Sequence, residues 1–297
     1  MEGAGTQSPE SLDQLLTEAG GTPDADYELR STAELVELMS TAEAAVPPAV
    51  RDAADEIAAA IDAIAERLAG GGRLFYVGAG TSGRLAAMDA EETVATFGAT
   101  PGQVVALAVP DATEDDRAGG AKALRAAGTD ASDAVVAISA SGRTPYVIGA
   151  LEAAAETGAL TVAVACVADS ELARSADHAI AILVGPEFIA GSTRLSAGTA
   201  QKLVLNAIST ISMIRLGKTF GNLMVDVTPA NDKLRARVRR IVQTATGASP
   251  DEVEAALEAA GGDAKVAIVS ILGSVDAETA RARLGAANGN VRLALHP

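Results

Sequence analysis

The chain has 297 residues, which is enough for one large domain or two modest ones. Its 23 Lys and Arg against 39 Asp and Glu give a net charge of −16, which argues against nucleic acid or an anionic membrane as partner, because both require clustered cations. A single cysteine excludes an internal disulfide and, with only two histidines, leaves little material for a metal site. No apolar run could span a bilayer and the polar start does not look like a signal peptide, so we expect a cytoplasmic protein.

Residues 1–55 are predicted to form an N-terminal arm followed by helices. The first 30 residues are rich in Gly, Thr and Asp, which indicates an arm that is either mobile or packed on a partner subunit. Over residues 31–69, apolar side chains recur at spacings of three and four, which predicts amphipathic helices. The triplet Gly70-Gly71-Gly72 ends the last of them.

The middle of the chain alternates between short apolar segments and segments with helical periodicity. The predicted strands cover 73–77, 104–109, 134–138, 160–166 and 179–184, and the predicted helices cover 84–95, 115–127, 145–156, 171–176 and 197–216. This alternation predicts an α/β domain over residues 56–232, with a doubly wound parallel sheet covered on both faces. Residues 233–297 contain only short helical segments, one of them opened by the cap signal of Ser249 and Pro250, and predict a small helical subdomain.

A glycine-rich loop follows the first predicted strand and opens a predicted helix. Its sequence, GAGTSG at residues 78–83, satisfies the G-x-G-x-x-G pattern of dinucleotide-binding folds. Asp111 follows the next predicted strand, at a place where an acid that binds ribose could lie. One hypothesis is therefore a nicotinamide-dependent enzyme.

Two features favour a phosphomonoester over a dinucleotide. The first loop carries adjacent hydroxyls, Thr81 and Ser82, and a second hydroxyl loop, SASGRT at 139–144, follows the third predicted strand. Loops at the carboxyl ends of parallel strands converge on one crevice, so these O–H and N–H donors would surround one compact anion. The alternative is that both are ordinary strand-to-helix turns with N-cap hydroxyls.

Several segments are similar to those of one enzyme family. They are VGAGTSGRL at 77–85, DAEETVATFG at 89–98, SASGRTPY at 139–146, GPEFIAGSTR at 185–194, AGTAQKLVLN at 197–206, GKTFGNLMVDV at 217–227 and NDKL at 231–234. From about residue 31 to the C-terminus, the chain resembles the N-acetylmuramic acid 6-phosphate etherases of the sugar isomerase (SIS) phosphosugar-binding superfamily. The resemblance implies a SIS-like fold with a C-terminal helical subdomain, a lyase of aminosugar metabolism without cofactor or metal, and a homodimer with its site near the subunit interface.

The chemistry that the resemblance implies is removal of D-lactate from position 3 of a 6-phosphorylated N-acetylated aminosugar. In the open-chain aldehyde the C2 proton is acidic, the C3–O bond breaks, and water adds to the unsaturated product, which two carboxyl groups can catalyse. The catalytic Glu of the family falls on Glu92, whose neighbour Glu91 points elsewhere on a helix. The alternative is that Glu92 is a solvated surface residue.

The second carboxyl group falls in a connection that is shorter than the family's. The match places Asp111 at the catalytic position and Glu114 at the acid that follows. Asp is one methylene shorter than Glu, and a displacement of about 1 Å can cost on the order of 100-fold in rate. The alternative is that residues 111–116 are only an acidic helix start, which favours the helix dipole.

The remaining site residues also follow from the resemblance. The phosphate would be bound by Gly80, Thr81, Ser82, Ser139, Ser141, Gly142, Arg143 and Thr144, and the rest of the substrate by Glu187, Ser192, Thr193 and Arg194. Alternatively, Glu187 lies at a rim or dimer contact and Arg194 in an interhelix salt bridge. Lys202 is interpreted as structural.

Two further departures from the family bear on the substrate. Ser196 replaces a lysine, and Gly20-Gly21 stand where the family's arm has an Arg-Asn pair. These changes leave two alternatives to the etherase open: an isomerase, epimerase or dehydratase acting on another phosphosugar, and a phosphosugar-binding regulator like the glucokinase regulatory proteins.

Overall fold

The centre of the protein is a five-stranded parallel sheet. A computed structural model describes residues 26–227 and 232–296. The strands are β1 (Leu74–Ala79), β2 (Val104–Val109), β3 (Ala134–Ile138), β4 (Leu160–Ala165) and β5 (His178–Ala181). Their spatial order is β2-β1-β3-β4-β5, and every neighbouring pair is parallel. Residues 1–25 of the predicted arm, including Gly20-Gly21, lie outside the described residues.

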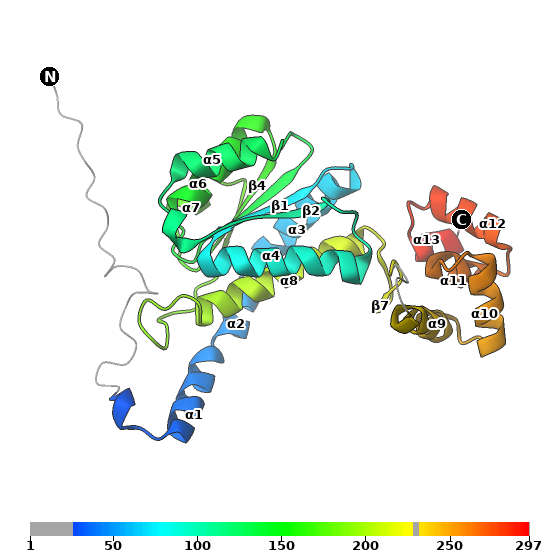
Figure 1. The fold of residues 1–297 in the computed structure, drawn as a ribbon, viewed down its shortest axis with the longest axis horizontal. Coiled ribbons are helices and arrows are strands. Elements are labelled where there is room, and N and C mark those ends of the chain that lie inside the picture. The colour runs from blue at the N-terminus through cyan, green and yellow to red at the C-terminus, as the bar shows by residue number, and fades with distance from the viewer. Residues whose placement is uncertain (1–25, 228–231, 297) are drawn as a thin grey trace.

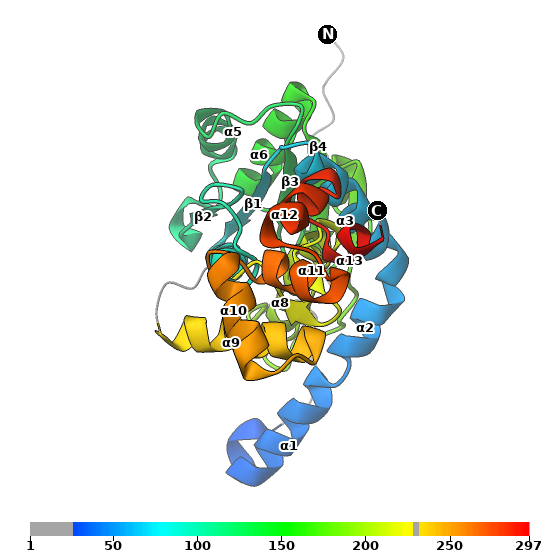
Figure 2. The ribbon, with the colours of Figure 1, turned by 90° about the vertical axis from the view of Figure 1, so that its right-hand side faces the viewer.

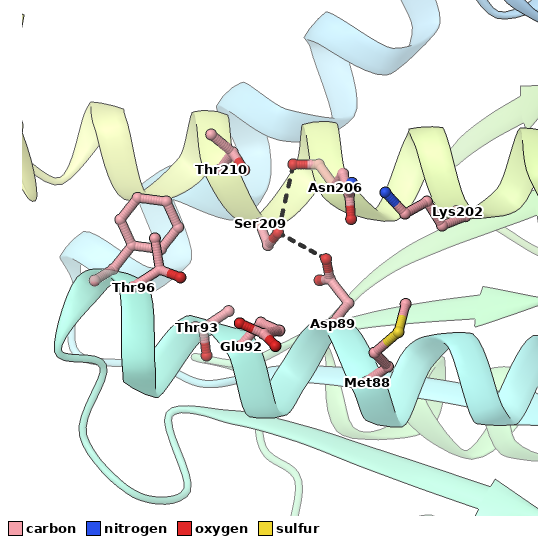
Figure 3. Close-up of a pocket in the computed structure, with 10 residues that line it drawn as sticks. Met88, Asp89, Glu92, Thr93, Thr96, Lys202, Asn206, Ser209 and Thr210 are labelled. Carbon is pink, nitrogen blue, oxygen red and sulfur yellow. Dashed lines mark hydrogen bonds between the residues drawn. The ribbon is translucent and has the colours of Figure 1, made fainter. Parts of the chain in front are cut away.

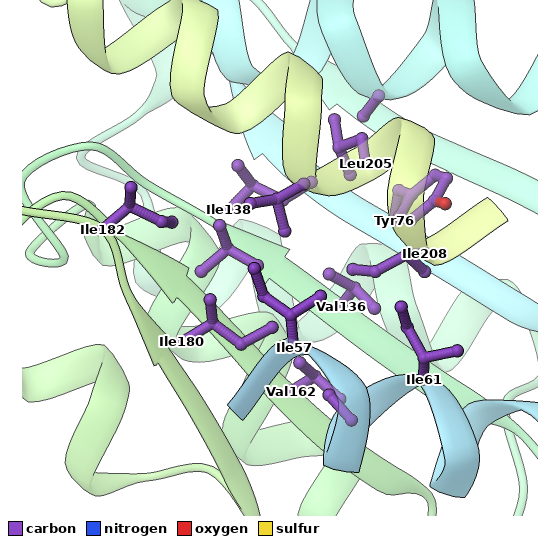
Figure 4. Close-up of a cluster of buried hydrophobic side chains, with 14 of the residues drawn as sticks. Ile57, Ile61, Tyr76, Val136, Ile138, Val162, Ile180, Ile182, Leu205 and Ile208 are labelled. Carbon is purple, nitrogen blue, oxygen red and sulfur yellow. The ribbon is translucent and has the colours of Figure 1, made fainter. Parts of the chain in front are cut away.

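Helices cover both faces of the sheet (Figure 1). They are α3 (Ala54–Ala69), α4 (Gly80–Phe97) and α8 (Ser196–Arg215) on one face, and α5 (Arg117–Ala126), α6 (Pro145–Thr157) and α7 (Glu171–Arg174) on the other. Alternate strand residues enter two different cores: Tyr76 and Val136 pack toward α3 and α8, whereas Phe75 and Val135 pack toward α6. Figure 4 shows the first of these cores. The doubly wound parallel α/β prediction is confirmed.

Two helices precede α3. They are α1 (Thr32–Glu43) and α2 (Val46–Asp52). The Ser31 hydroxyl and the Glu34 carboxylate form a capping box that opens α1, and prolines 47 and 48 occupy the first turn of α2. None of the residues of α1 is buried, and the helix extends away from the sheet (Figure 1).

The C-terminal part is a helical subdomain with its own core. Its helices are α9 (Asp232–Thr246), α10 (Pro250–Ala259), α11 (Ala264–Gly273), α12 (Ala277–Ala286) and α13 (Val291–Leu295), which Figure 2 shows grouped together. A short hairpin that the sequence did not predict, β6 (Thr219–Phe220) with β7 (Leu223–Met224), leads into it. The carboxylate of Asp226 pairs with Lys218 and with the nearly buried Lys265, both at 2.8 Å, and so ties this connection to α11. Within the described ranges, no helix is both long and apolar enough to cross a membrane.

Helices α5 and α6 approach each other closely because each has a glycine at the contact. A Cβ atom on Gly120 would lie 1.9 Å from the Tyr146 carbonyl oxygen, and one on Gly149 would lie 2.0 Å from that of Arg117. Both clashes are with backbone, which cannot rotate away as a side chain can. Neither helix can therefore accept a larger residue at this contact without moving.

We expect Gly120→Ala to lower the free energy of unfolding by about 1–3 kcal/mol, because overpacking forces the two helices apart. Gly70→Ala is a matched control in the same domain. Its Cβ would lie 3.4 Å from the nearest atom at a backbone angle that alanine adopts, so the expected change is within about 0.5 kcal/mol. Urea denaturation followed by circular dichroism measures both. Equal stabilities of the two variants would contradict the close contact.

Candidate functional site

The two hydroxyl loops lie next to each other at the carboxyl edge of the sheet. They follow β1 and β3, which pair directly, with Gly78 opposite Ile138. The chain leaves β1 for β2 on one side, whereas β3 lies on the other, so the order of the strands reverses between β1 and β3. In open α/β sheets such a switch point opens the crevice in which ligands bind. The topology thus brings together the residues of both loops.

The first loop is a tight turn from β1 into α4. Gly80 has φ +55°, a left-handed conformation that favours glycine, and a Cβ on Gly83 would lie 2.6 Å from the Gly78 carbonyl oxygen. The Ser82 hydroxyl is buried and donates to Gln201 Oε1 on α8 at 2.8 Å. Thr81 Oγ1 accepts a hydrogen bond from Arg84. The first N–H groups of α4 have no partner within the helix, which is the general basis of anion binding at helix N-termini.

The second loop is organised by the Ser139 hydroxyl. This oxygen accepts from the Gly142 N–H at 3.1 Å and lies 2.8 Å from Thr144 Oγ1 and 3.4 Å from Ser141 Oγ. The Arg143 N–H donates to Ser141 Oγ at 3.3 Å. Ser139 is almost fully buried, whereas Ser141, Arg143 and Thr144 are half-buried at the start of α6. Three hydroxyls therefore cluster at the N-terminus of a helix.

The segment at 185–194 places its acid, Glu187, inside the protein. Both carboxylate oxygens of the fully buried Glu187 accept backbone N–H groups of α8, from Ser196 at 2.9 Å and from Ala197 at 3.0 Å. The Ser196 hydroxyl, at the position where a lysine is lost, donates to Glu43 of α1. In this structure Glu187 thus caps α8, which is a role that the sequence did not suggest.

The other residues of this segment are more accessible. Ser192 and Thr193 are half-buried and Arg194 is exposed. The segment meets the first loop at Gly198, where a Cβ would lie 3.5 Å from the Thr193 carbonyl oxygen and 3.6 Å from Thr81 Cγ2.

Glu92 lines a cavity of about 350 Å³ between the parallel helices α4 and α8 (Figure 3). The cavity is lined by Met88, Asp89, Glu92, Thr93, Thr96 and Phe97 from α4 and by Lys202, Asn206, Ser209 and Thr210 from α8. Glu92 is exposed and makes no hydrogen bond or ion pair with any residue in the described ranges. Its carboxylate is therefore accessible to a ligand.

Asp89, one helical turn before Glu92, is the buried centre of this cavity. It accepts hydrogen bonds from Tyr76 Oη at 2.9 Å and from Ser209 Oγ at 3.0 Å. The Asn206 amide is oriented so that its oxygen accepts a hydrogen bond from Lys202 Nζ and its nitrogen donates one to Asp89 Oδ1, at 3.2 Å. Burial raises the pKa of Asp89, while its hydrogen bonds and the Lys202 ammonium lower it and the charge of Glu92 raises it further.

Sequence reasoning missed Asp89, Asn206 and Ser209 as members of this cluster. A signal was present on each helix. Asp89 and Glu92 are three residues apart on α4, and residues 202, 206 and 209 share one face of α8.

The candidate second acids lie beyond the end of β2, beside the first loop. Val109 pairs with Ala79, and a short 3-10 helix (Asp111–Thr113) follows. The side chain of Asp111 is outside the described part, and that of Glu114 is exposed. Asp116 caps α5 by accepting the Gly119 N–H at 2.8 Å, so the acidic run does supply a helix start. Asp111 and Glu114 remain predicted catalytic residues.

Comparison with known proteins gives one consistent family. The model described as the SIS domain matches residues 67–211, which include both hydroxyl loops and the cavity. The N-acetylmuramic acid 6-phosphate etherase of Rubrobacter xylanophilus is 53% identical over 295 residues, covering 96% of this chain and 97% of that protein. The enzyme of the same name from Streptomyces avermitilis is 54% identical, covering 96% of this chain and 94% of that protein. The one from Escherichia coli is 45% identical, covering 96% of this chain and 98% of that protein.

Solved structures share the fold. A candidate sugar-phosphate isomerase from Listeria monocytogenes superposes with a TM-score of 0.51 at 17% identity, covering 63% of this chain and 91% of that one. At this identity the likeness extends to the fold alone.

The buried carboxyl of Asp89 should make stability depend on pH. Its pKa in the folded protein lies above the ordinary value of 3.8, so ionisation costs folding free energy. This cost is absent below pH 3.8 and grows as the pH rises through the raised pKa. Relative to Asp89→Asn, which cannot ionise, the wild type should therefore lose stability as the pH rises.

Urea unfolding of both proteins across this range measures the difference. Ser209→Ala removes a hydrogen bond that lowers the Asp89 pKa, and should move the transition to higher pH. A wild-type-minus-variant difference that stays constant with pH would contradict the raised pKa.

Proposed function

The chain belongs to the family of the N-acetylmuramic acid 6-phosphate etherases, and from this premise we propose that it cleaves the 3-O-lactyl ether of N-acetylmuramic acid 6-phosphate as a carbon–oxygen lyase. One observation carries the proposal. Glu92, the acid that the family motif assigns, lines a cavity large enough for part of a small ligand and has no partner in the described ranges. The lone, buried Cys166 supports a reducing, cytoplasmic location.

The phosphate is bound in this proposal by the two loops at the switch point. Ser141 and Thr144 present hydroxyls at the start of α6, and Gly80, Thr81 and Ser82 present N–H groups at the start of α4. Two helix N-termini and their hydroxyls stabilise a dianion without a cluster of cations. This accounts for anion binding by a chain whose net charge is −16.

The elimination step of the reaction needs two proton transfers. A base removes the C2 proton of the open-chain aldehyde, the electron pair forms a C2=C3 double bond, and the C3–O bond breaks. An acid gives its proton to the departing lactyl oxygen, and water then adds a hydroxyl at C3 and a proton at C2. We assign Glu92 to one of these two roles and a carboxyl of the 111–114 segment, Asp111 or Glu114, to the other.

We also propose that the working unit is a homodimer in which each site is completed by both copies. Twelve helical residues separate Gly80 from Glu92, which corresponds to about 18 Å along α4. The phosphorus and C2 of the substrate are separated by six bonds of about 1.5 Å, and so by at most roughly 9 Å. The loops of one copy and Glu92 of the other would bridge this gap.

An exposed apolar side chain beside the cavity supports such an interface. Met88, four residues before Glu92 and on the same side of α4, lines the cavity and is 44% exposed.

The proposed activity is tested by proton NMR of the protein with N-acetylmuramic acid 6-phosphate in heavy water. We expect release of D-lactate and deuterium at C2 of the product. Glu92→Gln should lower lactate release by about 100- to 10,000-fold, the usual range for general acid–base catalysis. Glu91→Gln, which removes the same charge one residue away on another side of α4, should stay near the wild-type rate.

The pattern of loss also assigns the role of Glu92. Deuterium at C2 without lactate in Glu92→Gln identifies Glu92 as the acid, and loss of both signals identifies it as the base. In the wild type, deuterium without lactate would point to another phosphosugar as substrate. Neither signal, together with a thermal shift by sugar phosphate, would instead support the regulator.

Shared sites predict that two inactive variants complement each other. One chain carries Glu92→Gln and the other carries Ser141→Ala with Thr144→Val, and the two are co-expressed with different tags and purified through both. Each mixed dimer then has one intact site of two, so we expect about half of the wild-type activity. A mixed dimer without activity would show that each site lies within one chain, and a monomer in light scattering would contradict the dimer itself.

A further inference from the structure

One positively charged side chain lines the cavity that contains Glu92. Among its ten lining residues two are carboxylates, Asp89 and Glu92, and only Lys202 is positively charged. Lys202 is half-buried on α8 and forms no ion pair within the described ranges. Arg84, the arginine of α4, does not line this cavity. It lies in the first turns of the helix and donates a hydrogen bond to Thr81 of the first loop.

A relay of hydrogen bonds fixes the Lys202 ammonium. The Asn206 side-chain oxygen accepts from Lys202 Nζ at 2.6 Å, while its nitrogen donates to Asp89 Oδ1. Asp89 is in turn fixed by Tyr76 and Ser209. Figure 3 shows the amine directed along α8 toward Asn206 and Asp89. An ammonium has three donors, so this arrangement leaves two of them for a ligand.

The substrate of the proposed function carries two anionic groups. Its phosphate is matched by the hydroxyl loops, so the carboxylate of the lactyl group needs a different partner. The lactyl group is attached to C3, the carbon next to the one that loses its proton. Whatever binds this carboxylate must therefore lie in the same cavity as Glu92.

We infer that Lys202 binds the carboxylate of the 3-O-lactyl group and makes the enzyme specific for acidic ethers, an assignment that rests on the proposed function. Lys202 and Glu92 line the cavity from opposite helices, so the lactyl group would lie between them. Binding the carboxylate orients the ether oxygen toward its proton donor and positions the C3–O bond for cleavage. The sequence interpretation of Lys202 as structural is thereby replaced by a role in specificity.

The test compares the natural substrate with its carboxamide, in which the lactyl acid is replaced by the neutral lactamide of nearly the same shape. Wild-type protein should prefer the acid by at least about tenfold in kcat/KM, since a hydrogen bond to a charged group has this effect or more. Lys202→Met should abolish the preference by slowing the acid and leaving the amide little changed. Lys202→Arg, which retains the charge, should restore most of it.

Lys122→Met is the control, because it removes the same charge from an exposed position on α5 outside the site. It should behave as the wild type with both substrates.

Three outcomes would overturn the assignment. Wild-type protein that cleaves acid and amide equally well contradicts it without any variant, and so remains decisive if Lys202→Met does not fold. Equal losses for acid and amide in Lys202→Met, with a shifted pH profile, would show that Lys202 acts on Asp89 or Glu92 instead of the substrate. Wild-type protein that releases no product from either compound contradicts the proposed function, and with it this inference.

Discussion

The polar contact between α4 and α8 determines the geometry of the candidate site. Two buried hydrogen bonds, Ser82 to Gln201 and Ser209 to Asp89, join the helices across a separation of about 120 residues in sequence. Buried polar groups are costly unless they are paired, so these bonds allow only one register between the two helices. That register places Thr81 beside Gly198 and Glu92 across the cavity from Lys202.

In the proposed function, the same contact allows an acidic protein to bind an acidic substrate. The charges of the site are arranged in two places, and neither depends on a large positive field. At the sheet edge, the N-termini of α4 and α6 lie beside the hydroxyl groups of the two loops. In the cavity, one ammonium is oriented by Asn206 and by the buried carboxyl of Asp89. A net charge of −16 therefore does not prevent local groups from binding an anion.

The two places lie at different points along α4, which links the proposed chemistry to assembly. A site made only from one copy would have to extend over about 18 Å of helix, further than the substrate reaches. A second copy placed over the exposed Met88 would bring its own loops toward Glu92 and exclude water from the cavity. Catalysis and association would then depend on the same surface of α4.

The sequence determined the local features of this protein. Short apolar segments between segments of helical period predicted each strand of the sheet, and the composition of residues 78–83 and 139–144 predicted two turns rich in glycine and hydroxyl groups between a strand and a helix. These features are local, because each depends on neighbouring residues and on backbone conformations that only glycine adopts readily. The family motif likewise pointed to Glu92 from a contiguous segment.

Only the tertiary structure decided which distant residues meet. The hairpin of β6 and β7 has two-residue strands, too short to show a period. Glu187 looked like a ligand-binding acid, yet it caps α8, nine residues further along the chain. Lys202 and Asn206 come to face Asp89 and Glu92 because two helices pack in parallel against one sheet. The sequence of either helix alone does not indicate which other helix it packs against.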